Sequence, residues 1–226
     1  MYKRQSQLIT VDLSAFYIDV TKDRMYTFGA KSEARRSGQT AMYIIVDGLA
    51  RLLAPILSVT MDELWRMLPG EREASVHMAL FPTELAQWQD AALVERWSAL
   101  AAVRDQVNLQ LEEKRKDKTV GANLSAQATI AADGPTGALL RDYSAFLPAL
   151  FGVSHVTLKS PASAEATAGR QAASPKPDAG LQVLVEKAEG VKCERCWRYV
   201  PEVSQDAERT GLCPRCVEAL AEPVSL

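Results

Sequence analysis

Apolar side chains recur every three to four residues through most of the first 118 positions, a spacing that places them on one face of an α-helix. The pattern predicts one helix in "DLSAFYIDVTKDRMYT", capped by Asp12 or Ser14, and a second in "SEARRSGQTAMYIIVDGLARLLAPILS". A third is expected in "TMDELWRMLPG", with Thr60 as its cap. A fourth, the longest, is expected to begin at Thr83. We therefore expect residues 1–118 to form a helical bundle.

The second and fourth of these helices carry well-defined apolar faces. Such stripes are typical of helices that pack against a core. The expected faces consist of Met42, Ile45, Leu49, Leu52, Leu53 and Ile56 in the second helix, and of Leu85, Trp88, Leu93, Trp97, Leu100, Val103, Val107 and Leu111 in the fourth.

The pattern changes after residue 118. Residues 119–160 hold two short strand-like stretches, near Gln127–Ala131 and in "VSHVTLKS", with the helical stretch "GPTGALLRDYSAFLPALFG" between them. Residues 161–180 are rich in Ala, Ser and Pro, which predicts a flexible linker. Residues 181–226 begin with another strand, "LQVLVEKAEG". The expected fold is mainly α, with a helical bundle, a small α+β junction and a separate terminal module.

Composition and charge narrow the class of protein. The 226 residues are 47% hydrophobic and 24% charged, which is enough apolar material for a core. The formal net charge of −2 excludes a uniformly basic protein but leaves room for a local nucleic-acid-binding patch. The sequence has no apolar run long enough to span a membrane and no signal-peptide pattern at its start. A cytoplasmic location, with reduced cysteines, is the expectation.

The cysteines carry the strongest chemical signal. All four lie in two CxxC pairs separated by sixteen residues: Cys193, Cys196, Cys213 and Cys216. Four thiolates close the tetrahedral shell that Zn²⁺ prefers, so the spacing predicts one structural zinc ion. Two disulfides would need an oxidising compartment, and a thioredoxin-like site would need a single CxxC. Iron–sulfur ligation stays open, without a supporting feature.

Basic and aromatic residues surround these pairs, and each has two interpretations. Lys192, Arg195, Arg198 and Arg215 either offset the negative charge of a zinc–thiolate centre or contact phosphates. Trp197 and Tyr199 either pack on the zinc core, which the spacing favours, or stack on unpaired bases.

Two other basic clusters lie in the helical part. Arg35 and Arg36 are near an expected helix start, where the helix dipole disfavours cations, so a role in ligand binding stays open. The charge run "EEKRKDK" at 112–118 mixes both signs and is interpreted as a solvated helix end.

Several stretches together resemble the C-terminal part of the bacterial isoleucyl-tRNA synthetase family. "VDLSAFYIDVTKDRMYT", "LARLLAPILSVTMDELW", "SVHMALFP" and "VNLQLEEKRKDKTVGANLSAQATI" are similar to motifs of its anticodon-binding domain. "VEKAEGVKCERCWRYVPEV" with "CPRCVEAL" is similar to its zinc module. Val59 stands where the family pattern has an aromatic residue. The HIGH-type and KMSKS-type motifs that bind ATP in class I enzymes are missing from the sequence, so the resemblance implies a fragment.

The resemblance implies a role in holding the anticodon stem-loop of tRNA(Ile). ATP would bind only in the missing catalytic part, and the catalytic and editing domains of the same polypeptide would be partners of a monomer. The candidate tRNA contacts are Trp197, Lys192, Arg195, Arg198, Arg35 and Arg36. With this resemblance, both roles of Trp197 stay open. The rival hypothesis is a zinc-ribbon scaffold without an RNA ligand, whose stripe from Leu85 to Leu111 binds a protein partner.

Overall fold

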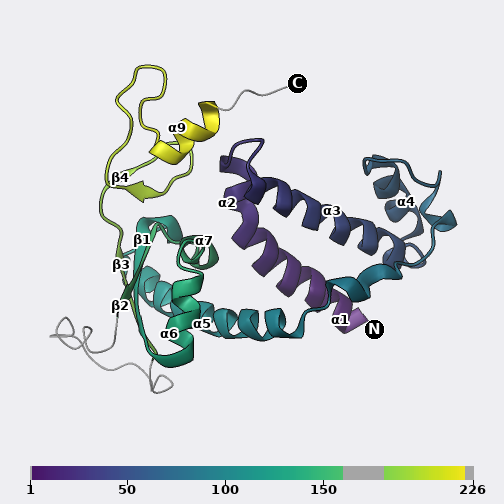
Figure 1. Cartoon of the computed structure of the whole chain (residues 1–226), viewed down its shortest axis with the longest axis horizontal. Coiled ribbons are helices and arrows are strands. Elements are labelled where there is room, and N and C mark those ends of the chain that lie inside the picture. Colours follow the sequence, from purple (N-terminus) through teal and green to yellow (C-terminus); the bar gives the residue numbers. More distant parts are fainter. Residues whose placement is uncertain (1, 160–180, 222–226) are drawn as a thin grey trace.

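The computed structural model describes residues 2–159 and 181–221 and is mainly helical, with two small sheets. Figure 1 shows a long first helix with α3 beside it, α4 at one end, and α5 leading back to the sheet. The helices are α1 (Tyr2–Gln7), η1 (Leu8–Ile18), α2 (Asp19–Thr27), α3 (Glu33–Leu53), α4 (Ser58–Met67), η2 (Val76–Met78), η3 (Glu84–Trp88), α5 (Ala91–Lys116), η4 (Asn123–Ser125), α6 (Gly134–Asp142), α7 (Leu147–Phe151) and α9 (Pro214–Ala221). The strands are β1 (Ala126–Ala132), β2 (His155–Lys159), β3 (Leu181–Lys187), β4 (Val191–Lys192) and β5 (Tyr199–Val200).

The first three helical elements form one continuous helix. Its middle segment, η1, has the wider π-type hydrogen bonding over Leu8–Ile18. The helix is already formed at Tyr2, so the expectation that Asp12 or Ser14 caps its start is wrong. Both residues lie inside the helix, because helical geometry extends through the polar residues that precede the apolar pattern.

The predicted second and third helices, α3 and α4, pack around a small core at the end of the molecule remote from the sheet. We call the buried cluster Ala50, Ala54, Met61, Trp65 and Val76 the distal core. The expected face of α3 is wrong at Leu52 and Ile56, which are exposed. The buried positions of this region are instead the small residues Ala50 and Ala54. Their short side chains leave room for the large Trp65 ring in the distal core. Thr60 is not a cap, since α4 already begins at Ser58.

The long helix α5 begins at Ala91 rather than at the expected Thr83. The Asp90 carboxylate accepts a hydrogen bond from the Leu93 backbone N–H at 2.9 Å, which makes Asp90 the N-cap. The segment before it is the short 3₁₀ turn η3. Trp88 is 64% exposed and so does not belong to the buried stripe, and the side chain of Leu85 lies outside the described residues.

The C-terminal half of the expected stripe on α5 is confirmed. Leu100, Val103, Val107 and Leu111 are buried in the main core of the protein. This core also contains Val20 of α2, strand β1 and helices α6 and α7. At its edge, the Trp97 ring makes edge-on contacts with Phe16, Tyr143 and Phe146, with centroids 5.9–6.1 Å apart. Helices α2 and α5 are therefore tied to the junction, whereas α3 and α4 pack around the distal core.

The junction sheet has the strand order β2-β1-β3. Strand β1 runs parallel to β2, with Ile130 opposite Leu158, and antiparallel to β3, with Ile130 opposite Val183. The predicted strands are confirmed, and the predicted helix between β1 and β2 is present as α6 and α7. Strand β3, expected to open the terminal module, pairs with β1. The domain boundaries at 118, 160 and 180 stay a prediction, and the linker 161–180 lies outside the described residues.

Replacing the N-cap of α5 gives a test of this fold. We expect Asp90→Ala to lower the free energy of unfolding by about 1 kcal/mol, because the Leu93 N–H loses its acceptor. Chemical denaturation monitored by circular dichroism measures the change. Asp105→Ala, at an exposed position inside α5, is the matched control and should be neutral or slightly stabilising. Equal losses in both variants would contradict the assignment of the cap.

Candidate functional site: a four-cysteine centre docked on a helix end

Two tight turns bring the cysteines together. Strands β4 and β5 flank the first pair, and the Cys193 N–H donates to the Arg198 carbonyl oxygen at 2.9 Å. Helix α9 begins at the second pair, where the Cys216 N–H donates to the carbonyl oxygen of Cys213 at 2.9 Å. The pairing of these turns forms a compact unit with Val200 and Leu212 around the sulfurs.

The sulfur geometry fits zinc. All four cysteines are buried, and their sulfurs lie within 4.8 Å of one another. The sulfurs of Cys196 and Cys213 are 3.7 Å apart. A Zn–S bond of about 2.3 Å in a tetrahedron places sulfurs about 3.8 Å apart. Four soft donors in a closed shell leave no position for substrate, so the centre is suited to a structural rather than a catalytic ion.

The thiols have divergent acidities in the absence of a cation. Burial by itself raises the pKa of Cys193, but backbone N–H groups of Cys196, Cys213 and Arg195 lower it to about 6. Burial is also the main cause that raises the pKa of Cys216 to about 12. Metal binding must therefore displace protons from this cluster, and zinc affinity should fall as the solution is acidified.

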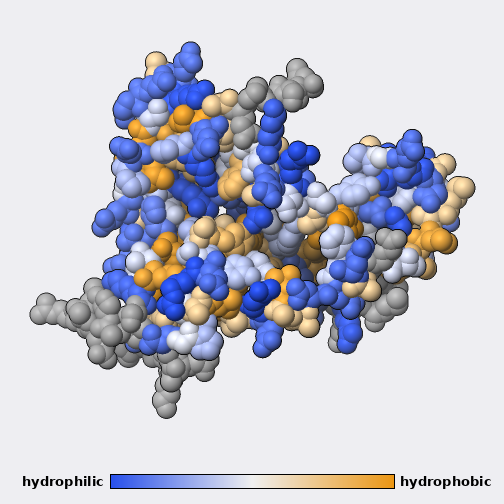
Figure 2. Space-filling model, in the orientation of Figure 1, coloured by the Kyte–Doolittle hydropathy of each residue, from blue (hydrophilic) through white to orange (hydrophobic). Residues whose placement is uncertain are grey.

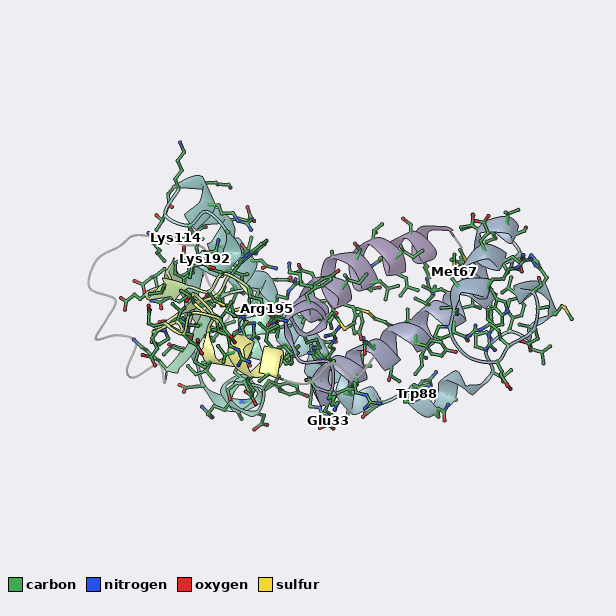
Figure 3. The ribbon with its side chains drawn as sticks, turned by 90° about the horizontal axis from the view of Figure 1, so that it is seen from above. Glu33, Met67, Trp88, Lys114, Lys192 and Arg195 are labelled. Carbon is green, nitrogen blue, oxygen red and sulfur yellow. The ribbon has the colours of Figure 1, made fainter. Side chains whose placement is uncertain are left out.

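Three of the four neighbouring cations point to the end of α2 rather than outward. Arg198 donates to the Asp23 carboxylate at 2.9 Å, and Arg215 donates to the same carboxylate at 2.7 and 3.0 Å. Arg195 donates to the Thr27 carbonyl oxygen and to the Cys216 sulfur. Figure 3 shows Arg195 between the zinc module and α2, with Met67 and Trp88 at the opposite end of the molecule.

Trp197 follows the first cysteine pair and is 61% exposed. The expectation that it packs on the zinc core is therefore wrong. Its φ of 64° lies in the left-handed region, which a residue with a side chain adopts at a cost of about 1–2 kcal/mol. The Lys192 ammonium lies 5.5 Å from the centre of the indole ring. Tyr199 is half-buried, and its backbone N–H donates to the Ser154 hydroxyl at 2.7 Å.

Beside these contacts, a cavity of about 640 Å³ is lined by the zinc module on one side and by α2, the end of α5 and η4 on the other, and Trp197 lies on its wall. A volume of this size accommodates a nucleotide-sized ligand. The predicted residues among its lining are Lys192, Arg195, Trp197 and Arg198; the residues that sequence reasoning missed are Lys22, Tyr26, Arg115 and Asn123.

The missed residues come from three separate elements: Lys22 and Tyr26 from α2, Arg115 from the end of α5, and Asn123 from η4. Tyr26 is 80% exposed, and Arg115 donates to the Asn123 side-chain oxygen. Arg115 belongs to the charge run at 112–118, which we interpreted as a solvated helix end. The basic residues of that run were the feature of the sequence that could have pointed to Arg115 as a cavity residue. Arg35 and Arg36 do not line the cavity. Arg35 donates to the Phe28 carbonyl oxygen at 3.1 Å, and Arg36 is exposed.

Two segments of the chain, the helical part and the zinc module, match known protein families. Residues 1–130 match the family described as the anticodon-binding domain of tRNA ligase, which covers more than half of the chain. The chain belongs to this family. Residues 190–219 of this anticodon-binding chain match a second family, described as the zinc finger found in FPG and IleRS. That match encloses both cysteine pairs, so the family comparison and the sulfur geometry independently support a zinc site.

The relatives of this anticodon-binding chain are isoleucine–tRNA ligases. It is 40% identical to the protein of Geobacter sulfurreducens over 220 residues, which is 97% of this chain and 23% of the relative. It is 44% identical to that of Syntrophotalea carbinolica over 223 residues, 98% of this chain and 23% of the relative. The chain thus spans about a quarter of the length of the curated relatives it matches. Within the described residues, no helix is both long and apolar enough to cross a membrane.

Removing one cysteine tests the metal centre. We expect Cys213→Ser to purify with far less than one zinc ion per chain, because a three-thiolate site binds the ion weakly. Elemental analysis of the freshly purified protein measures the content, with the unchanged chain expected to hold one ion. The helical part should keep its circular-dichroism signal. Full zinc content in the variant would contradict the ligand set.

The backbone at position 197 gives a second test. We expect Trp197→Gly to be more stable than Trp197→Ala by about 1 kcal/mol, because only glycine adopts the left-handed region without cost. Both variants lose the indole ring, so their difference isolates the backbone. Thermal unfolding of the zinc-loaded proteins measures it. Equal midpoints would show that position 197 carries no such strain.

Proposed function

We propose that this chain binds unpaired anticodon nucleotides of tRNA(Ile) in the cavity beside Trp197. The observation that carries the proposal is the exposed indole with the Lys192 ammonium above it, at the wall of a nucleotide-sized cavity in a chain of the anticodon-binding family. The zinc ion, held by Cys193, Cys196, Cys213 and Cys216, would be structural: it fixes the turn that presents Trp197.

The chemistry of the cavity suits an anticodon loop. Loop bases are unstacked, so a flat aromatic ring can stack on them, and such stacking contributes about 1–3 kcal/mol per base. Lys192 would supply positive charge for the adjoining phosphates, with Lys22 and Arg115 beside it. These two are ion-paired at the surface with Asp19 and Glu112 and would have to exchange those partners for phosphate. Arg195 and Arg198 line the same cavity but are held by α2, so we assign them to its walls. Because the whole chain has a net charge of −2, binding should be weak and strongly salt-dependent.

The larger protein that such a chain serves would join isoleucine to tRNA(Ile) with ATP. We assign ATP binding to its catalytic part and propose a cytoplasmic monomer.

Exposed apolar side chains gather over α4 and the connector after it, visible at the right-hand end of Figure 2. Met67, Met78 and Leu80 are among them, and each is at least two-thirds exposed. This apolar surface is where we expect the catalytic and editing domains to contact the chain.

The rival scaffold hypothesis loses its main support. It rests on a partner helix binding the stripe from Leu85 to Leu111. Leu100, Val103 and Val107 are buried in the main core, so this half of the stripe is already occupied.

An RNA titration tests the proposal. We expect the zinc-loaded chain to bind a cognate anticodon stem-loop at low salt more tightly than one with a changed anticodon. Trp197→Ala should weaken cognate binding by about 5- to 150-fold, the equivalent of one lost base stack. Fluorescence anisotropy of labelled RNA measures both affinities. Arg141→Ala, at an exposed position on α6 outside the cavity, is the control and should change binding little. Equal affinities for the two anticodons would overturn the proposal.

A further inference from the structure

Asp23 lies where the zinc module meets α2 and gathers several donors. Its carboxylate accepts hydrogen bonds from Arg198 and Arg215, at 2.7–3.0 Å, and from the Thr27 hydroxyl at 2.8 Å. Only 19% of the Asp23 side chain is exposed. Burial by itself raises the pKa of this carboxyl, but Arg215 and Arg198 hold it below its usual range. Asp23 is therefore a charged, largely buried group that faces two cations of the module.

These arginines are placed by the turns that hold the cysteines. Arg195 lies between Cys193 and Cys196, and Arg215 lies between Cys213 and Cys216. Arg198 comes two residues after Cys196. An arginine positioned by either turn reaches α2 only while that turn keeps its shape. A zinc ion bound by the four cysteines would fix the shape of both turns, because each turn would give it two sulfurs.

Arg195 links the metal shell to α2 within a single side chain. Its guanidinium donates to the Thr27 carbonyl oxygen at the end of α2 and lies 3.6 Å from the Cys216 sulfur. Its second terminal nitrogen is 3.4 Å from the Tyr26 carbonyl oxygen. The last carbonyl groups of a helix carry partial negative charge, so this cation stabilises the helix end as well as the thiolates.

We propose that Asp23 is a positioning residue that couples zinc binding to the docking of the module on α2. Zinc binding orders the arginines that reach Asp23, and docking through Asp23 in turn retains the zinc. This reciprocity follows from thermodynamic linkage between the two events. Docking also places Trp197 and Lys192 opposite α2 across the cavity. The consequence of this placement for RNA binding rests on the proposed function.

Loss of the carboxylate should loosen the docking of the module without unfolding the protein, because the contacts of Arg195 with the Thr27 carbonyl and of Tyr199 with Ser154 remain. Without the Asp23 carboxylate, the arginines would still lie beside the negatively charged thiolates of the zinc centre, so their charge would remain partly offset. The main core would keep Val20, one helical turn before Asp23, and strand β3 would still connect the module to the sheet. The effect is thus expected at the metal site and the helix end rather than in the global fold.

Zinc retention provides the test. We expect Asp23→Asn to release zinc to the chelator 4-(2-pyridylazo)resorcinol at least about tenfold faster than the unchanged chain, because an affinity loss in the usual range of coupling appears mainly as faster dissociation. Asp12→Asn makes the same charge change about three turns earlier on the same helix, at an exposed position, and should release zinc at the unchanged rate. Asp23→Glu, which keeps the carboxylate, should restore most of the retention.

Hydrogen exchange provides the second readout. Asp23→Asn should raise exchange in residues 193–200, and removal of zinc from the unchanged chain should raise exchange at residues 23–27 of α2. If Asp23→Asn does not fold, Thr27→Val decides, because it removes one donor to Asp23 without changing charge and should act in the same direction more weakly. Unchanged zinc release and unchanged exchange in a folded variant would overturn the proposal.

RNA binding separates this proposal from the proposed function. With zinc in excess, Asp23→Asn should still weaken stem-loop binding, because the module is held less firmly against α2. If the unchanged chain binds no stem-loop, the proposed function fails, and the zinc-release and exchange measurements judge the coupling by themselves.

Discussion

The burial of one face of α5 against the junction sheet is the contact on which the arrangement of the whole chain depends. Leu100, Val103, Val107 and Leu111 share the main core with β1 and with Val185 of β3, and the Val20 side chain of α2 enters the same core. Asp23 follows Val20 by three residues and so lies on the same side of the helix. A packing contact deep in the protein thus sets the position of the carboxylate that receives the zinc module. The far end of α5 then delivers Arg115 to the cavity wall.

The charges of the terminal module are divided between two tasks. Arg195, Arg198 and Arg215 are used inside the protein, where Asp23, the end of α2 and the thiolates provide negative charge. Lys192 and Trp197 stay on the cavity side of the module. This division explains how a chain with a net charge of −2 can present a positive, aromatic surface locally. It also means that counting basic residues near the cysteines overstates the number available to RNA.

The sequence predicted what depends on local spacing. Two CxxC pairs indicate a zinc site because the turn geometry is local, and the buried half of the α5 stripe follows from helical periodicity. The start of α5 could not be predicted because both Thr83 and Asp90 are residue types that cap helices. The structure shows a separate 3₁₀ turn between them, so the α-helix begins only after Asp90. The exposure of Leu52 was missed because the closest helix contact uses Ala50 and Ala54, which carry a weak apolar signal.

The pairing of Arg198 with Asp23 joins residues 175 positions apart, so no local pattern could reveal it. The unusual backbone at Trp197 was equally hidden, although it bears on the proposed function. A turn of this kind needs only a residue that tolerates positive φ, and glycine meets that need at no steric cost. A tryptophan there is destabilising, and its ring does not contribute to the buried core around the sulfurs. We therefore connect the strain at this exposed aromatic residue with the base stacking proposed for it, which the adjoining cavity and cation support.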